Sequence, residues 1–237
     1  MKNKFIFLVL ILMIGITSGC KKEFLDLAPA NTISNAQLAE NPAAVQAIIN
    51  GIYANLRTYS IGGNTGHIDY GLRGVMAGLD MMSNDVTMAR FHWYGFFYNY
   101  SGRVQTATRT RIFWNTYYTQ VAEANSVINA IDPATTDPSA KALLGQALAL
   151  RAFFTFNAAR IYAHTYIGHE SDLCIPMPTG LSFEGKPRST VSEVYAQIKT
   201  DAEASVDLLA DFNRGNRQEV NQAVAQAFLA RVYLEMG

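Results

Sequence analysis

The segment ALRAFFTFNAARIY, residues 149–162, decides the fold class of this chain. Its apolar side chains are spread almost all round a helical projection, and a helix with that pattern is buried on most of its sides. Arg151 and Arg160 interrupt the pattern, and a guanidinium group among apolar side chains must be paired, because an unpaired buried charge is costly. The segment therefore predicts a central core helix, with both arginines in structural ion pairs or bonded to carbonyl groups.

Helical periodicity also precedes this segment. Asn41 and Pro42 are typical of an N-cap and a first helical turn, and apolar residues follow at helical spacing over 45–56. A weaker helix is expected over residues 72–79 and a longer one over residues 108–131. The N-terminal half therefore supplies three helices before the central one.

The same periodicity continues beyond the central helix, which is expected to run from Ser139 to Tyr166. Residues 167–188 form a loop that is rich in proline and glycine. Thr190 and Glu193 then frame a capping box that begins another helix, and a last helix begins near Asn221. No stretch with strand alternation competes with these helices, so the predicted fold class is all-α, built from helical pairs in a solenoid-like stack.

The first nineteen residues are expected to be an export signal. Lys2 and Lys4 form a basic start, and the apolar run 5–16 follows them. As a helix this run spans roughly 18 Å at about 1.5 Å per residue, whereas the core of a bilayer is about 30 Å thick. Residues 1–19 therefore predict a cleaved secretory signal, and no later segment is expected to be apolar enough to span a membrane.

Cys20 stands at the end of this signal, where small residues before a cysteine resemble a bacterial lipobox. Thr17 departs from the motif, which usually has an aliphatic residue there, and the alternative is an ordinary signal peptide with an incidental cysteine. Acylation with two or more chains would anchor the protein stably to a membrane and would leave Cys174 without a disulfide partner. The predicted organisation is a lipidated tether over residues 20–40 and a helical domain over residues 41–237.

The charge balance argues against nucleic acid as a partner. The chain has 19 basic and 19 acidic side chains, and removal of Lys2 and Lys4 leaves 17 basic ones, a formal net charge of −2. A nucleic-acid-binding domain needs a basic face to neutralise phosphates. We therefore expect no nucleic-acid partner.

The run FHWYGFFYNY, residues 91–100, is the strongest candidate for a ligand site. Seven of its ten residues are aromatic, with neither helical nor strand periodicity, and it lies in a long connection between two predicted helices. Long connections in compact folds are usually functional or disordered, and so many aromatic residues disfavour disorder. Flat rings with a few polar groups nearby suit a sugar. We expect one to three rings to face a ligand, and the candidate ligand-binding residues are Trp93, Tyr94, Tyr98, Asn84 and Asp85.

Enzyme chemistry finds little support in the sequence. The histidines show no metal-ligand motif, and His164 with His169 is interpreted as a solvated helix end, so neither a metal nor a cofactor is expected. Asp80 and Asp85 could form a carboxylate pair of the glycosidase kind, but Asp85 fits better as a cap or as a hydrogen-bonding partner of a ligand hydroxyl. We therefore expect no catalytic residues.

Short fragments along the chain resemble one protein family in their type and their order. Cys20 is followed by FLDLAP at residues 24–29, and the other fragments are NGIY at 50–53, ALRAFF at 149–154, RSTV at 188–191 and AFLARVYL at 227–234. In this order they resemble the SusD/RagB-like surface lipoproteins of Gram-negative bacteria. The resemblance covers nearly the whole chain.

That resemblance implies a non-catalytic cell-surface protein, lipid-anchored in the outer membrane. Members of the family capture oligosaccharides, or in some cases peptides, and cover a TonB-dependent transporter of the SusC type. Their fold consists of tetratricopeptide-like helical pairs that carry an irregular ligand-binding region. Two alternatives stay open, a lipid-anchored helical adaptor for protein partners and a surface glycosidase.

The chain departs from the family in its length, because family members are considerably longer. The helix expected from residue 221 ends at Gly237, so Phe228, Leu229 and Val232 are expected to lack a following helix as partner and to leave an apolar stripe exposed. The sequence is therefore interpreted as the N-terminal portion of a SusD-like protein, with much of the ligand surface beyond it.

Overall fold

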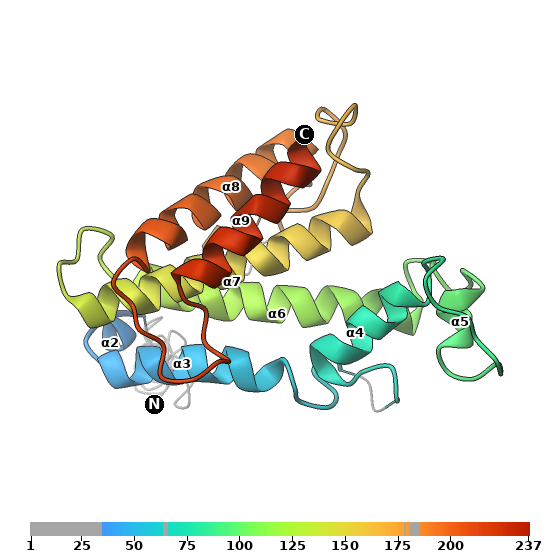
Figure 1. Cartoon of the computed structure of the whole chain (residues 1–237), viewed down its shortest axis with the longest axis horizontal. Helices are drawn as coiled ribbons and strands as arrows, with labels where there is room; N and C mark the ends of the chain where they lie inside the picture. The colour runs from blue at the N-terminus through green and yellow to red at the C-terminus, as the bar shows by residue number, and fades with distance from the viewer. Residues whose placement is uncertain (1–34, 64–65, 178, 181–184) are drawn as a thin grey trace, which may run out of the picture. The chain divides into compact units, whose positions relative to one another are not determined.

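The computed structural model describes residues 35–63, 66–177, 179–180 and 185–237 (Figure 1). One compact unit extends from Asn35 to Gly237. The predicted signal peptide, Cys20 and the tether up to residue 34 lie outside the described residues. The tether was predicted to reach residue 40, but helix α2 (Asn35–Ala39) lies inside that range and belongs to the compact unit.

The secondary structure of the described residues is helical, apart from isolated β-bridges such as the one between Tyr59 and Tyr70. This confirms the all-α fold class. The helices after α2 are α3 (Pro42–Asn55), α4 (Gly71–Asp80), α5 (Gly95–Tyr98), α6 (Thr108–Ala130), α7 (Pro138–Tyr162), α8 (Val191–Leu208) and α9 (Gln222–Met236).

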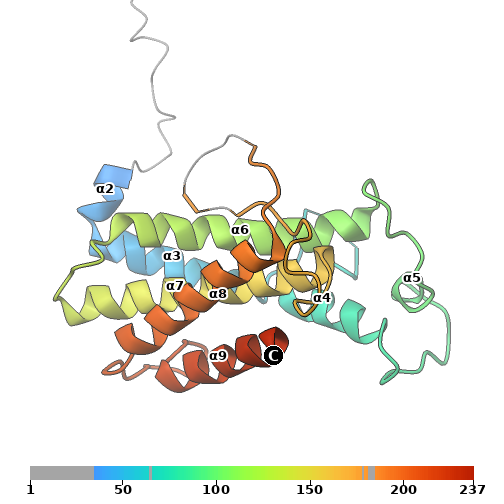
Figure 2. The same ribbon diagram turned by 90° about the horizontal axis from the view of Figure 1, so that it is seen from above.

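The long helices pack in sequential order, with α6 against α7, α7 against α8 and α8 against α9. Helix α3 lies along α6 on the side away from α8 and α9 (Figure 1). In both views α2 and α5 lie at opposite ends of the helical domain (Figure 2). The core between the helices contains fully buried side chains from α3, α6, α7 and α8, among them Ile49, Ile52, Tyr117, Val121, Phe154, Phe156, Tyr195 and Ile198.

Helix α7 is the central helix that residues 149–162 predicted. It begins where the Asp137 side chain accepts hydrogen bonds from the amides of Ser139 and Ala140, with Pro138 in the first turn. By length and composition α7 is also apolar enough to cross a membrane, so the expectation that no such segment follows the signal was wrong. Its apolar window is 94% buried inside the fold, as in the core helix of a globular domain.

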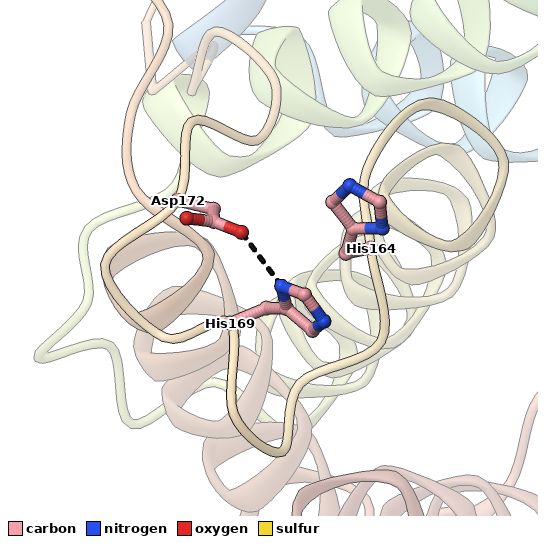
Figure 3. A group of neighbouring side chains, drawn as sticks. All are labelled: His164, His169 and Asp172. Atoms are coloured by element: carbon pink, nitrogen blue, oxygen red, sulfur yellow. Dashed lines mark hydrogen bonds and ion pairs between the residues drawn. The ribbon is translucent and has the colours of Figure 1, made fainter.

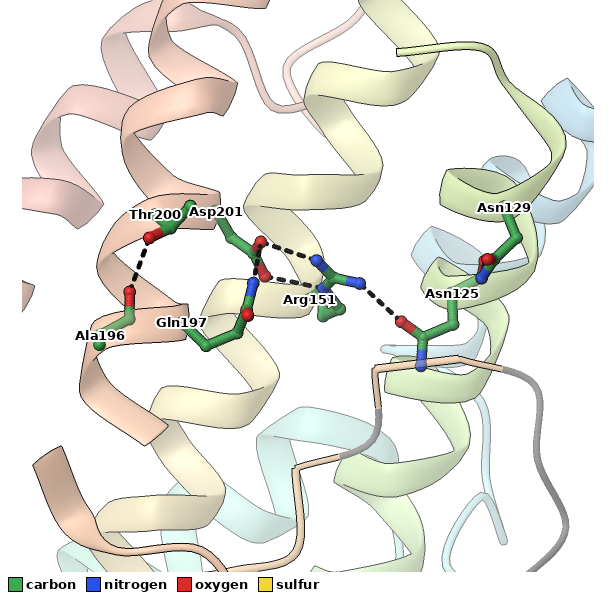
Figure 4. A network of polar contacts seen from close by, with 7 residues as sticks. All are labelled: Asn125, Asn129, Arg151, Ala196, Gln197, Thr200 and Asp201. Atoms are coloured by element: carbon green, nitrogen blue, oxygen red, sulfur yellow. Dashed lines mark hydrogen bonds and ion pairs between the residues drawn. The ribbon is translucent and has the colours of Figure 1, made fainter. Parts of the chain in front are cut away.

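Arg151 is paired, as its place in α7 predicted (Figure 4). It donates two hydrogen bonds of 2.7 Å to the carboxylate of Asp201 on α8 and one of 2.9 Å to the side-chain oxygen of Asn125 on α6. Gln197 donates to the same carboxylate over 2.8 Å. Arg160 differs, because it is exposed and forms a longer ion pair with Glu235.

The structure departs from the predicted elements at three places. The sequence did not predict the short helices α2 and α5, because one turn has too few residues to show a period and is stabilised by tertiary contacts. Helix α7 ends at Tyr162 instead of Tyr166. Tyr166 lies in the irregular segment after α7, but its ring still packs on the buried ring of Tyr195, with 5.2 Å between centroids.

Helix α9 corrects the expectation that Phe228, Leu229 and Val232 lack a partner, although Val224, Tyr233 and Leu234 of the same helix are exposed. Phe228 is 9% exposed and its ring meets those of Phe153 and Phe156 of α7 at 5.8 and 5.6 Å. Val232 is fully buried and Leu229 packs against the core. These residues are covered because α9 turns its apolar side toward α7 and α8, which sequence periodicity alone does not specify.

Candidate ligand-binding site

The aromatic run 91–100 lies between α4 and α6, and one of its rings holds it to the core. Phe97 is 5% exposed and stacks on Phe113 of α6, with ring centroids 5.5 Å apart and planes 5° apart. Gly78 of α4 makes room for this stack, since a Cβ there would lie 3.1 Å from the ring of Phe97. The run therefore packs against α4 and α6. Its residues 95–98 form the single helical turn α5.

Gly95 leaves room for the ring of Phe91 beside the backbone of this turn. A Cβ at Gly95 would lie 2.4 Å from the ring of Phe91, so only a glycine allows that ring to lie over the backbone. The Phe91 ring then meets the edge of Phe96, with centroids 5.4 Å apart. The two rings form one continuous aromatic surface.

The rings of the run divide into a buried and an exposed set. Trp93 is 61% exposed, and among the described residues its one ring neighbour is the imidazole of His67, with centroids 6.1 Å apart. Phe91 and Tyr100 are more than half exposed, and Tyr98 is at the margin of exposure. Five of the seven rings are thus exposed, with Phe96 as the fifth, and Trp93 is the most accessible of them. Which one to three of them face a ligand stays a prediction.

Tyr94 contacts the rest of the fold, and its predicted role in ligand binding stays a prediction. It is half-buried, packs against the core, and its hydroxyl donates to the carbonyl of His67 over 3.4 Å. Burial raises the pKa of the Tyr94 phenol above its usual value. Tyr94 therefore supports the loop that carries His67, beside Trp93.

That loop brings two further aromatic residues, which the sequence analysis missed. Tyr59 and Tyr70 are both exposed, pair through an isolated β-bridge, and have ring centroids 5.9 Å apart. Gly71 permits the bridge, because its φ is +61° and a Cβ there would lie 2.4 Å from the carbonyl oxygen of Leu56. Two tyrosines eleven residues apart carry no periodic signal, so only the fold pairs them.

Asn84 and Asp85, the predicted polar partners of the rings, are both exposed. The Asp85 amide donates to the hydroxyl of Ser83 over 3.1 Å, so this segment is a turn after α4. The hydroxyl of Tyr100 bonds the carbonyl of Met82, which brings the end of the aromatic run close to this turn. Within the described part of the chain, no hydrogen bond or ring contact joins the Asn84 or Asp85 side chain to the run, and their role stays a prediction.

A hollow of about 200 Å³ lies behind the run, between α5 and the start of α6. Arg109 lies over the ring of Phe96, with 4.0 Å from the guanidinium carbon to the ring centroid, and Arg103 lies over Tyr100 at 5.2 Å. Neither arginine was predicted from the sequence as a site residue. The signal that could have found them is the absence of Asp and Glu between Asp85 and Glu123.

The cluster of His164, His169 and Asp172 lies in the loop after α7 (Figure 3). Nδ1 of His169 is 2.7 Å from a carboxylate oxygen of Asp172, and the two imidazole rings stack with centroids 4.5 Å apart and planes 19° apart. One ligand atom from each residue lies within 4.8 Å of the others. Because imidazole lone pairs lie in the ring plane, nearly parallel rings do not point them at one common ion, and the arrangement is that of a hydrogen-bonded turn.

A larger hollow of about 510 Å³ lies away from the aromatic run, between the start of α7 and the end of α8. Its charged lining residues are Lys141, Asp207, Asp211 and Glu219, and Phe212 is its one aromatic residue. It has no wall of exposed rings. The aromatic run is therefore the better candidate for holding flat sugar rings.

Comparison with known proteins adds a family relationship. Residues 23–234 match a SusD-like family described as starch-binding and associating with the outer membrane. SusD-like protein P2 of Formosa agariphila is 26% identical over 237 residues, which is 100% of this chain and 43% of that protein.

Solved structures share the fold. A SusD-like carbohydrate-binding protein from Bacteroides vulgatus superposes with a TM-score of 0.75 at 24% identity, over 83% of this chain and 42% of that one. A putative sugar-binding protein from the same species gives a TM-score of 0.64 at 26% identity, over 82% and 42% of the two chains. The chain thus spans less than half the length of these relatives.

Proposed function

The chain belongs to the SusD-like family, and from this premise we propose that it is a lipid-anchored glycan-binding protein that captures oligosaccharides for a TonB-dependent transporter. The observation that carries the proposal is the aromatic surface of residues 91–100, from which Trp93, Phe91 and Tyr100 project while Phe97 is held in the core. Exposed aromatic side chains gathered in one place are unusual on a soluble surface unless they bind something.

The geometry of this surface suits a sugar better than a protein helix. The apolar face of a pyranose ring stacks on a flat aromatic side chain, while its hydroxyl groups need polar partners at the edge. Trp93 offers such a face, and the backbone and side chains of residues 83–85 supply donors and acceptors near the end of the run. No enzymatic activity is part of the proposal.

Localisation and partnership complete the proposal. Acylated Cys20 would hold the protein to the outer membrane, and a SusC-type transporter would receive the captured glycan. The resemblance of the chain to its family supports both, together with the match of residues 23–234 to proteins that associate with the outer membrane. We propose surface exposure on the same ground.

The test is glycan binding by the purified chain in affinity electrophoresis, over a panel of neutral and charged polysaccharides. We expect at least one polysaccharide to retard the protein, and we expect Trp93→Ala to weaken that retardation about five-fold or more, because stacking a flat ring on an aromatic side chain contributes roughly 1–3 kcal/mol where it is known for nucleobases. Tyr233→Ala, at an exposed ring of α9 distant in sequence, is the matched control and should leave the retardation unchanged.

The two alternatives give different outcomes in the same experiment. An adaptor for protein partners shows no retardation on any polysaccharide. A surface glycosidase releases product from the retarding polysaccharide, and its activity disappears in Asp85→Ala. Retardation without product supports glycan capture.

A further inference from the structure

The hollow behind the aromatic run is lined by positively charged groups, which a neutral sugar does not require. Its walls are the rings of Phe96, Phe97, Phe113 and Tyr162, and two guanidinium groups, those of Arg103 and Arg109, border it. None of its lining residues is acidic. At about 200 Å³ the hollow is smaller than the roughly 300–1,000 Å³ of a site that encloses a whole ligand, but it has room for one substituent.

The guanidinium group of Arg109 has a hydrogen-bond donor for which the described residues supply no acceptor. Its Nε is buried without a hydrogen-bond partner, and the guanidinium carbon lies 4.0 Å from the centroid of the Phe96 ring. Gly102, with φ +68°, keeps the space beside it open, since a Cβ there would lie 3.1 Å from Nη1. Removal from water lowers the pKa of Arg109, which is the cost of holding this charge away from solvent without an anion.

Among the described residues, two arginines form ion pairs with acidic side chains. Arg151 pairs with Asp201 and Arg160 pairs with Glu235. Neither Arg103 nor Arg109 takes part in an ion pair among the described residues; both contact aromatic rings instead. A buried donor left without an acceptor costs about 1–3 kcal/mol, so an unpaired Nε at this place favours a bound acceptor.

The sequence around the hollow is also biased toward positive charge. Between Asp85 and Glu123 the chain contains four arginines and no acidic residue, although basic and acidic residues are equal in number over the whole chain. Helix α6 also begins here, and Ala107 at its N-cap offers no side-chain hydrogen bond. The positive end of a helix adds to the attraction for an anion, here beside two guanidinium groups.

We propose that this hollow binds an anionic substituent, a carboxylate or a sulfate, of an acidic glycan whose sugar rings lie on the exposed aromatic surface. This inference rests on the proposed glycan-binding function and specifies its ligand class. Phe96 connects the two parts, because its ring contacts both Arg109 and the exposed ring of Phe91. Guanidinium groups match the planar oxygens of a carboxylate or a sulfate with paired hydrogen bonds.

Matched pairs of polysaccharides test the inference in affinity electrophoresis with the purified chain. Polygalacturonate is compared with its methyl ester, and dextran sulfate with dextran, so that each pair differs in charge on the same backbone. We expect the charged member of one pair to retard the protein at least ten-fold more strongly than its neutral counterpart. The pair that responds identifies carboxylate or sulfate. Retardation should weaken as NaCl rises, because salt screens charges beyond about 8–10 Å.

Variants assign the effect to the hollow. Arg109→Gln should weaken retardation by the charged polysaccharide about ten-fold or more, the loss expected for charge-assisted hydrogen bonds, and Arg103→Gln should weaken it less. Arg217→Gln, at an exposed arginine before α9, is the control for non-specific attraction and should change nothing. Thermal unfolding checks that Arg109→Gln is folded; if it is not, Arg109→Lys keeps the charge without the forked donors and should lose affinity.

Each outcome separates the inference from the function on which it rests. Equal retardation by charged and neutral members, or a charge preference that survives in both Arg109→Gln and Arg103→Gln, overturns the acidic ligand class while glycan binding stands. Retardation by no polysaccharide overturns both.

Discussion

Arg151 and Asp201 lie 50 positions apart in the sequence and form a two-point ion pair that joins α7 to α8, with Nε and Nη2 each 2.7 Å from a carboxylate oxygen. Both side chains are almost completely buried. Asn125 of α6 accepts a third hydrogen bond from the same guanidinium group. One arginine therefore links three consecutive long helices at their common core.

Removing one partner of this pair should destabilise the fold strongly. Arg151→Met leaves a buried carboxylate without its cation, and breaking a buried pair in this way costs about 3–5 kcal/mol of unfolding free energy. Urea denaturation measures the change. The double variant Arg151→Met/Asp201→Leu should recover much of the loss, since an apolar replacement of both partners is often nearly neutral.

The exposed pair of Arg160 and Glu235 is the matched control for that experiment. Its two atoms are 3.4 Å apart and the arginine side chain is 45% exposed. Arg160→Met should cost less than about 1 kcal/mol, as is usual for pairs screened by water. Equal losses for Arg151→Met and Arg160→Met would contradict the central role of the buried pair.

Gly62 allows the loop that carries Tyr59, His67 and Tyr70 to approach α6 closely. A Cβ there would lie 2.9 Å from both Cα and the carbonyl oxygen of Ile112, which are backbone atoms that cannot turn aside. We expect Gly62→Ala to lower the free energy of unfolding by about 1–3 kcal/mol and to weaken glycan binding, because the loop has to move away from α6.

Gly51 provides the opposite case in the same chain. It lies inside α3, and a Cβ there would meet nothing within 4 Å. Gly51→Ala should therefore stabilise the protein by about 0.5–1 kcal/mol through the higher helix propensity of alanine. Thermal unfolding of both variants, measured side by side, should shift in opposite directions; shifts in one direction would refute the steric argument.

Tyr53 should make stability depend on alkaline pH. Its hydroxyl donates to Gln146 over 2.8 Å and accepts from the amide of Val220 over 2.9 Å, and burial raises its pKa to about 12. A folded-state pKa above the unfolded value of 10.0 means that the folded state keeps the phenol neutral. This stabilisation is complete below pH 10 and is lost as the pH rises toward 12.

Tyr53→Phe isolates that contribution. At pH 7 the variant should be less stable by about 1–3 kcal/mol, because Gln146 and the amide of Val220 lose a buried partner. The difference between wild type and variant should shrink between pH 10 and 12, as measured by urea midpoints along the pH series. Tyr59→Phe, at an exposed ring, serves as control. A difference that stays constant up to pH 12 would rule the linkage out.

The lipid anchor makes a prediction that depends on no contact in the helical domain. Cys20→Ala should move the protein from the membrane fraction to the soluble fraction after export, since acylation requires the cysteine thiol. Cys174→Ala, at a buried cysteine of the helical domain, should stay with the membranes. Continued sedimentation of Cys20→Ala with membranes would show that another feature attaches the protein.

The sequence by itself determined the all-α class and the positions of the long helices, because periodicity and caps are local. Asn41 with Pro42, the capping box of Thr190 with Glu193 and the apolar run of α7 act over one or two turns, and the structure has each of them where it was predicted. The need of Arg151 for a partner was also visible, because a charge inside an apolar run requires one.

Only the tertiary structure decided which groups meet. Asp201 as the partner of Arg151, Phe97 as the buried ring of the aromatic run, and Arg109 over Phe96 all follow from how α4, α6 and α8 pack. Neighbouring aromatic residues have nearly the same hydrophobicity, so composition cannot tell which one faces the core and which faces solvent. That choice depends on contacts such as those with Gly78 and Phe113, which the folded chain alone brings together.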